Sequence, residues 1–185
     1  DAIVDIDLNQ GKISIGKVES LKTTIKYGKL VIDELLEGRH NIKAKFSKIA
    51  IKKADGLNLE IRYARNVDIS EVKTINVKAN ASNLKIGKLE KEAIINGKLG
   101  ELRIDQIGKD FEFIDIDLKN TDAILNLPDV DYQFYGNMRS CKVDVKDQID
   151  LNMRSSFDKI IYQNDNKKSN QMININAAFS KISLQ

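Results

Sequence analysis

The segment Tyr27-Gly28-Lys29-Leu30-Val31-Ile32 returns nineteen residues later as Phe46-Ser47-Lys48-Ile49-Ala50-Ile51. Both copies hold a small residue, a polar residue and then a triplet whose first and third members are apolar. Alternation with period two is typical of a β-strand that buries one face. Ten copies occur along the chain, and their first apolar positions are Ile13, Leu30, Ile49, Val67, Leu84, Leu102, Leu125, Val143, Ile160 and Ile182.

The spacing of these copies predicts a stacked fold. Successive first apolar positions are 17 to 23 residues apart, about 19 on average. A second alternating segment, such as residues 57–61, lies in most intervals, so each unit is a strand, a turn, a strand and a turn. Such a unit cannot bury its apolar face alone, whereas stacked neighbours share one core. We therefore predict an all-β, single-stranded, right-handed parallel β-helix (β-solenoid) of about ten coils of about 19 residues.

Two further columns support stacking in register. Two residues before the first apolar position stand small residues, as a tight corner requires. These are Gly11, Gly28, Ser47, Ser82, Gly100, Ala123, Cys141 and Ser180. The residue before the corner is aromatic in Tyr27, Phe46, Phe157 and Phe179, and Tyr63 is one residue out of step. This pattern predicts aromatic stacking between adjacent coils.

Composition sets the broad class. The chain has 185 residues, and no linker divides it, so we expect one solenoid domain over residues 1–185. A net charge of +3 argues against nucleic acid as a partner, and no apolar run approaches the length of a membrane span. The lone Cys141 excludes an internal disulfide. Because the sequence begins at Asp1 rather than Met, we expect the mature or trimmed part of a longer chain from which a leader or an upstream domain was removed.

Two groups of exposed charges are candidate ligand-facing residues. Lys12, Lys29 and Lys48 precede successive triplets, and Lys142, Lys159 and Lys181 do so later in the chain. They would form two short outward columns able to bind an acidic glycan or a lipid headgroup. A solvated face that discourages aggregation is the simpler interpretation. Asp115 and Asp117 share one face of a strand and would suit calcium or acid-base chemistry, although alternating charge is also ordinary for an exposed strand.

The sequence offers few residues or motifs that could support catalysis. His40 is the only histidine, which excludes multi-histidine metal sites, and we expect it on the surface. No nucleotide-binding, metalloprotease or calcium-loop motif occurs. We therefore predict no catalytic residue, no cofactor and no metal ligand.

Both ends of the sequence are strand-like and lack a polar cap. Residues 2–6 at the start are mostly apolar, and residues 182–185 at the finish alternate between apolar and polar. Uncapped solenoid ends favour pairing with another chain. We therefore expect the rod to associate end to end with another copy or to continue into a removed segment.

The aromatic and small corner motifs point to one protein group. The segments 27–32 and 46–51, together with Phe179-Ser180-Lys181-Ile182-Ser183-Leu184, resemble adhesin-like β-helix domains of Bacteroidetes, related to the auto-transporter adhesin head (GIN) family. The resemblance spans essentially the whole chain. It implies a right-handed β-helix at the cell envelope or surface and supplies no catalytic residues.

These observations favour a non-catalytic envelope or surface module, either an adhesin-like binder or a rigid spacer. Its expected partner is a surface glycan or an envelope protein, and its expected location is secreted, periplasmic or outer-surface. Two alternatives stay open. One is a polysaccharide-processing lyase or hydrolase, since parallel β-helices host such enzymes. The other is the ectodomain of an envelope sensor.

Overall fold

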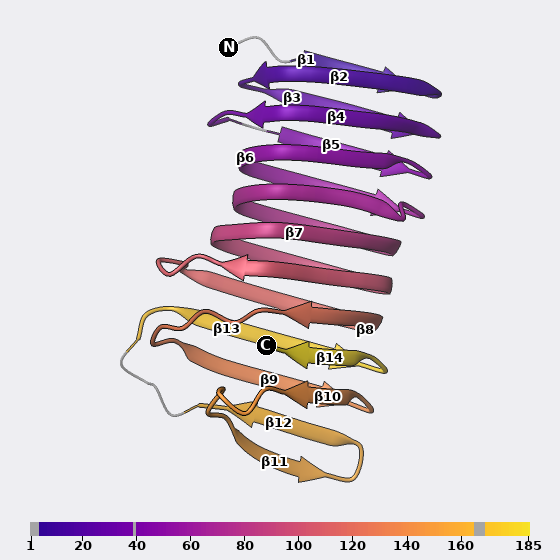
Figure 1. Ribbon diagram of the computed structural model, residues 1–185. Coiled ribbons are helices and arrows are strands. Elements are labelled where there is room, and N and C mark those ends of the chain that lie inside the picture. Colours follow the sequence, from indigo (N-terminus) through magenta and orange to yellow (C-terminus); the bar gives the residue numbers. More distant parts are fainter. Residues whose placement is uncertain (1–3, 39, 165–168) are drawn as a thin grey trace.

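The computed structural model describes residues 4–38, 40–164 and 169–185. Over these residues the protein is all-β without a helix, and its strands pair into one continuous sheet that winds into a rod (Figure 1). The strands are β1 (Val4–Leu8), β2 (Gly11–Val18), β3 (Leu21–Lys26), β4 (Gly28–Leu35), β5 (His40–Lys45), β6 (Lys48–Arg62), β7 (Asn66–Ile107), β8 (Phe113–Leu125), β9 (Gln133–Arg139), β10 (Lys142–Val145), β11 (Asn152–Ser156), β12 (Lys159–Gln163), β13 (Met172–Ala178) and β14 (Lys181–Leu184).

From β1 to β8 the coils stack in sequence order with parallel pairing. Leu30 lies opposite Ile49 and Ile49 lies opposite Val67, so equivalent apolar residues of successive triplets form one interior column. Most of these side chains are fully buried. The stacked parallel coils confirm the predicted β-solenoid, with about six turns in regular succession. Long apolar β-branched and leucine side chains dominate because each inward position is covered by the coils above and below.

The corner residues carry a hydrogen-bond ladder that explains why they are small. The Ser47 hydroxyl accepts a hydrogen bond from the Gly28 N–H of the preceding coil at 3.2 Å and donates to its own strand at the Lys45 carbonyl at 2.8 Å. Ser82 repeats this arrangement, accepting from the Ala64 N–H at 3.0 Å. Ser180 accepts from the Thr121 N–H, also at 3.0 Å. A buried hydroxyl at this corner thus satisfies a backbone donor that would otherwise lose its partner.

The seventh repeat is shifted by two residues from the predicted register. Ala123 lies opposite Leu102 and Leu125 lies opposite Ile104, so Ala123 is a core residue and Thr121 takes the small corner position. The prediction that placed Ala123 at the corner and Leu125 first in the triplet is wrong. A shift of two residues keeps every apolar side chain on the inner face, so alternation alone does not distinguish the two registers.

The order of coils changes after β8. The last coil, β13 with β14, lies between β8 on one side and β9 with β10 on the other. The C-terminus therefore lies within the stack, while the chain that precedes it forms the far end of the rod (Figure 1). This corrects the expectation that the repeats stack in sequence order and that Ile182–Leu184 is a free solenoid end.

An antiparallel hairpin forms the far end. β12 pairs antiparallel with β9 and with β11, so the repeat at Ile160 belongs to a hairpin rather than to a parallel coil. Phe157 occupies the hairpin turn and is fully exposed, away from the predicted aromatic column. The polar composition of residues 164–170 predicts an exposed loop, of which residues 165–168 lie outside the described residues.

His40 is buried, contrary to the surface position expected for it. Its side chain is 1 % exposed and stands in an interior column between Leu21 and Leu57. Its Nε2 lies 2.7 Å from the Leu36 carbonyl, whereas Nδ1 has no partner among the described residues. Because the coils stack in register, the first residue of β5 lies in the core. The equivalent position is leucine in both neighbouring coils.

Candidate functional site

Three aromatic rings form an exposed ladder along one corner of the rod. Tyr27 and Phe46 stack with ring centroids 5.1 Å apart, and Phe46 and Tyr63 stack at 4.9 Å, with planes within 10° of parallel. The exposed fractions of these residues are 58 %, 42 % and 50 %, so the ring edges face solvent. The prediction of aromatic stacking between adjacent coils is confirmed for these three residues, which we call the aromatic ladder.

The backbone aims each ring of the ladder in the same direction. Tyr27, Phe46 and Tyr63 all have φ between 52° and 55°, in the left-handed region. That region costs about 1–2 kcal/mol for a residue with a side chain, and the corner hydrogen bonds and ring stacking offset it. Tyr63 is in step with Phe46 because Lys45 lies opposite Arg62, and the extra residue is Arg65, placed after the corner at Ala64. Tyr63 is offset relative to the triplet that follows it because of this one extra residue, and it is not offset relative to the strand that precedes it.

Phe179 stands in the same corner column without a ring neighbour. Its strand neighbours place it beside Asn120 and Ser140, and no ring contact joins it to another aromatic residue in the described part of the chain. The column therefore carries a continuous ring stack only over the coils from Tyr27 to Tyr63.

Like charges line both sides of the aromatic ladder. Lys26, Lys45 and Arg62 immediately precede the rings and lie opposite one another; we call them the preceding cations. Lys12, Lys29 and Lys48 lie on the other side, also in register; we call them the following lysines. Their predicted outward column is confirmed, and all six side chains are exposed.

Few of these cations are neutralised. Arg62 pairs with Glu60 at 2.8 Å, whereas Lys26, Lys45 and the three following lysines make no ion pair with any described residue. Lys45 instead places its Nζ 5.3 Å from the centre of the Phe46 ring, a cation–π contact. Like charges directly opposite each other on adjacent strands destabilise a sheet. These columns therefore do not add to the stability of the sheet.

Another edge of the same coils shows how the chain places compensated charges. Lys17, Glu34, Lys53 and Glu71 lie opposite one another in that order, so charges of opposite sign alternate from coil to coil. Lys17 Nζ lies 2.6 Å from a Glu34 carboxylate oxygen, and this contact lowers the pKa of Glu34 and raises that of Lys17. This second edge needs no external counter-ion, in contrast to the columns beside the aromatic ladder.

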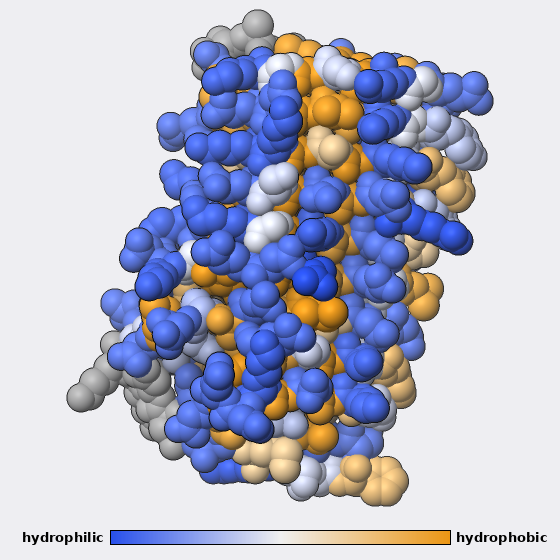
Figure 2. Space-filling model, in the orientation of Figure 1, coloured by the Kyte–Doolittle hydropathy of each residue, from blue (hydrophilic) through white to orange (hydrophobic). Residues whose placement is uncertain are grey.

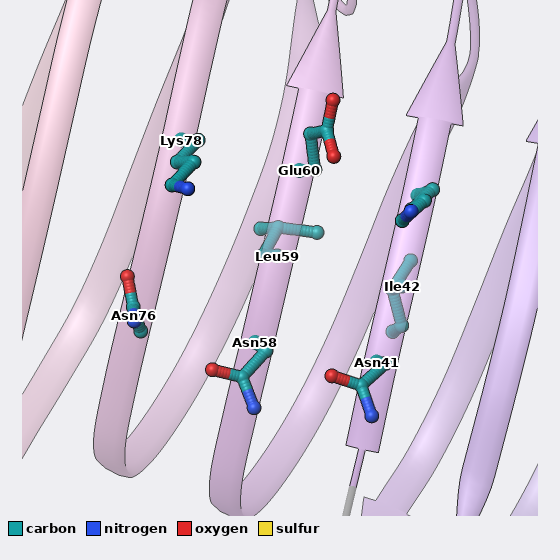
Figure 3. A pocket seen from close by; sticks show the side chains of 8 residues that line it. Asn41, Ile42, Asn58, Leu59, Glu60, Asn76 and Lys78 are labelled. Carbon is teal, nitrogen blue, oxygen red and sulfur yellow. The ribbon is translucent and has the colours of Figure 1, made fainter.

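A shallow polar groove adjoins the preceding cations. It has a volume of about 340 Å³ and follows the strands that carry Asn41, Asn58 and Asn76, which lie opposite one another (Figure 3). None of these three amides has a hydrogen-bond partner among the described residues. Lys43, Glu60 and Lys78 form the next row of the groove. The amides offer both donors and acceptors at one-coil spacing, which suits a ligand rich in hydroxyl groups.

The surface view shows the same organisation. Hydrophilic side chains stand in rows parallel to the rod axis, with hydrophobic surface visible between the rows (Figure 2). Such rows follow from in-register stacking, because each outward column repeats with the rise of one coil, about 4.8 Å. A linear ligand lying along the axis would meet the same kind of side chain at each coil.

The remaining candidate residues lie elsewhere on the rod. Lys142 and Lys181 are neighbours in one column, but Lys159 lies opposite Arg139 in the hairpin, so the second predicted lysine column is wrong in that member. Asp115 and Asp117 lie opposite Asn174 and Asn176 and share one face, and no ion pair to either is present among the described residues. No group of three or more His, Cys, Asp or Glu side chains that could hold a metal occurs in the part of the chain that the structure describes.

Sequence reasoning missed the asparagine row and the preceding cations. Their signal was present, because Lys26 and Lys45 stand directly before the two aligned aromatic residues. The row of Asn41, Asn58 and Asn76 belongs to the second strand of each coil. Its signal in the sequence is an asparagine directly before an apolar residue in each of these strands.

No protein-family model matches the chain, and no curated protein or solved structure is significantly similar to it. Among the described residues, no helix has the length and apolar character needed to cross a bilayer.

Proposed function

We propose that the protein is a non-catalytic binding module for an acidic glycan, which lies along the rod over the aromatic ladder and its flanking cations. The observation that carries this proposal is the pair of like-charge columns beside exposed rings, in which Arg62 alone has an ion-pair partner among the described residues. A polyanion with regularly spaced carboxylates or sulfates would neutralise successive lysines. The asparagine row would hydrogen-bond hydroxyl groups of the same ligand.

The proposal extends to location and architecture. An exposed glycan-binding rod belongs at the cell envelope or outer surface, in keeping with the resemblance to adhesin-like β-helix domains of Bacteroidetes. Right-handed winding is expected because parallel crossover connections are right-handed in nearly all known cases. The count of about ten repeats likewise stays a prediction, since the last copies depart from simple stacking.

The test compares two sets of lysine substitutions. Lys26, Lys29, Lys45 and Lys48 are changed together to Gln, and binding of a fluorescent oligogalacturonate and of a heparin oligosaccharide is measured by anisotropy. We expect a loss of at least about tenfold in affinity, because four unpaired cations are removed. The matched control changes four lysines that have ion-pair partners to Gln and should leave affinity nearly unchanged; these are Lys17, Lys22, Lys52 and Lys53.

Several outcomes would overturn the proposal. Equal affinities for both variants would show that the charged corner is not the binding surface. Affinity that does not fall as NaCl is raised would exclude an electrostatic mode of binding. Cleavage of either oligosaccharide during the titration would instead favour a lyase or hydrolase, and stronger binding of oligodeoxythymidylate would favour nucleic acid.

A further inference from the structure

The aromatic ladder ends at a gap of one residue in the corner column. Tyr63 N–H donates to the Asn80 carbonyl at 2.9 Å, which places Ala81 as the corner residue of the next coil. Ala81 has φ of 48°, and Leu99, the corner residue of the coil after it, has φ of 60°. All these side chains therefore leave the rod in the same direction, and the small methyl group of Ala81 occupies a place that a ring fills in the three preceding coils.

The dimensions of this gap match one ring. Phe46 covers one face of Tyr63, while the other face points toward the Ala81 level, and Tyr63 and Leu99 are both about half exposed. Two coils separate Tyr63 from Leu99, or about 9.6 Å along the axis. Rings in the ladder are spaced by 4.9 and 5.1 Å, so one inserted ring would contact Tyr63 on one side and Leu99 on the other.

Polar residues border the gap on the side of the preceding cations. Asn80 is exposed at the Ala81 level, opposite Arg62 of the coil before, and Lys98 immediately precedes Leu99. Lys98 makes no ion pair with any described residue. The gap therefore combines two apolar walls with an amide and a cation. At the other end of the ladder, Tyr27 lies opposite the polar residue Gln10 of the first coil.

We propose that this gap, which we call the Ala81 notch, is a subsite for one pyranose ring of the acidic glycan. The apolar face of the sugar would continue the aromatic ladder on Tyr63, and its carboxylate or sulfate would lie near Lys98. This inference rests on the proposed function, and it assigns the position at which the polymer is anchored.

The decisive variant is Ala81→Tyr, which should fill the notch with the protein's own ring. Tyrosine is already accepted at the same left-handed corner in Tyr27 and Tyr63, so we expect an intact fold and an unfolding midpoint at or above that of the unmodified protein. Affinity for oligogalacturonate should fall about tenfold. The control Asn120→Tyr places a ring at a corner with φ of 49° beyond Leu99 and should leave affinity unchanged.

A second pair keeps the test informative if Ala81→Tyr does not fold. Tyr63→Ala removes a wall of the notch and should weaken binding about tenfold, whereas Tyr27→Ala removes a ring at the other end of the ladder and should weaken it less. Wild-type affinity in Ala81→Tyr, or equal losses in Tyr63→Ala and Tyr27→Ala, would overturn the notch while leaving glycan binding intact. If the unmodified protein binds neither acidic oligosaccharide, the proposed function itself fails.

Discussion

The two ends of the rod are built from the same repeat but in different ways. From β1 to β8 each coil pairs with the coil that follows it in sequence. Beyond β8 the final coil is placed between β8 and β9, and the segment at β11 and β12 turns into an antiparallel hairpin. The contrast teaches that the repeat specifies how two coils pair but does not specify which coil becomes the neighbour of another.

The largest expected effect is on the free energy of unfolding and concerns the core of the last coil, formed by β13 and β14, which we call the inserted coil. Ile175 is completely buried between Ile116 of β8 and Gly136 of β9. Ile175→Ala should lower the free energy of unfolding by about 2–5 kcal/mol, because it leaves a cavity between two coils. Ile15→Ala, in the half-buried first coil, should cost roughly 1 kcal/mol. Urea unfolding measures both, and a larger cost for Ile15→Ala would contradict the placement of β13 in the interior.

The corner hydroxyls compare the two regions directly. Ser82 and Ser180 each accept a buried backbone N–H at 3.0 Å, one in the regular stack and one in the inserted coil. Replacement of either by Ala should cost about 1–3 kcal/mol, since it leaves the N–H of Ala64 or Thr121 without a partner. Similar losses in thermal unfolding would show that the inserted coil is bonded as firmly as the others. A negligible effect of Ser180→Ala alone would show that its corner is not formed.

Much of this architecture could be predicted from the sequence, and the exceptions have physical causes. The all-β class, the interior columns and the stacking of Tyr27 on Phe46 follow from period-two alternation at regular spacing. The corner position of Thr121 does not follow from the sequence, because a shift of two residues keeps the same side chains on the inner face. The position of the last coil does not follow from the sequence either. The apolar alternation of β13 is the same as in other coils, so it does not indicate that this coil stacks out of sequence order.

The candidate site was predicted only in part. The lysines at 12, 29 and 48 were found because they precede recognisable triplets. The cations at 26 and 45 and the notch at Ala81 required the observed register, because they depend on which corner residues lie above one another. His40 was misplaced, since a polar residue at the start of a strand gives no sign that its column is interior.

His40 is a polar residue in the core of the regular stack, and its replacement by an apolar residue should raise stability. His40→Leu would place leucine between Leu21 and Leu57 and remove from the core an Nδ1 that has no hydrogen-bond partner among the described residues. We expect stabilisation of about 1 kcal/mol, because the cost of a buried unsatisfied atom outweighs one lost hydrogen bond to the Leu36 carbonyl. Differential scanning calorimetry would show a higher midpoint. A lower midpoint would show that the hydrogen bond between Nε2 and the Leu36 carbonyl stabilises the stack by more than the buried Nδ1 costs.

The smallest effect comes from a surface carboxylate of the regular stack. The hydrogen bond from Arg103, together with Lys85 at 3.2 Å, lowers the pKa of Asp105. The stabilisation it provides is therefore present above the ordinary carboxyl pKa and is lost as the pH falls through the lowered value. Asp105→Asn should destabilise by about 0.5 kcal/mol at neutral pH and have no effect once the carboxyl is protonated. Urea midpoints across the acid range test this, and a difference that persists in strong acid would rule out the charge interaction as its cause.

The inserted position of the last coil can be measured by cysteine cross-linking after Cys141→Ser. Asp117 and Asn176 are partners on adjacent strands, whereas Asp117 and Asn137 are two coils apart, about 9.6 Å, because β13 lies between them. A disulfide requires Cα atoms closer than about 7 Å. The account predicts rapid oxidation of Asp117→Cys with Asn176→Cys and none of Asp117→Cys with Asn137→Cys. The reverse result would show that the coils stack in sequence order.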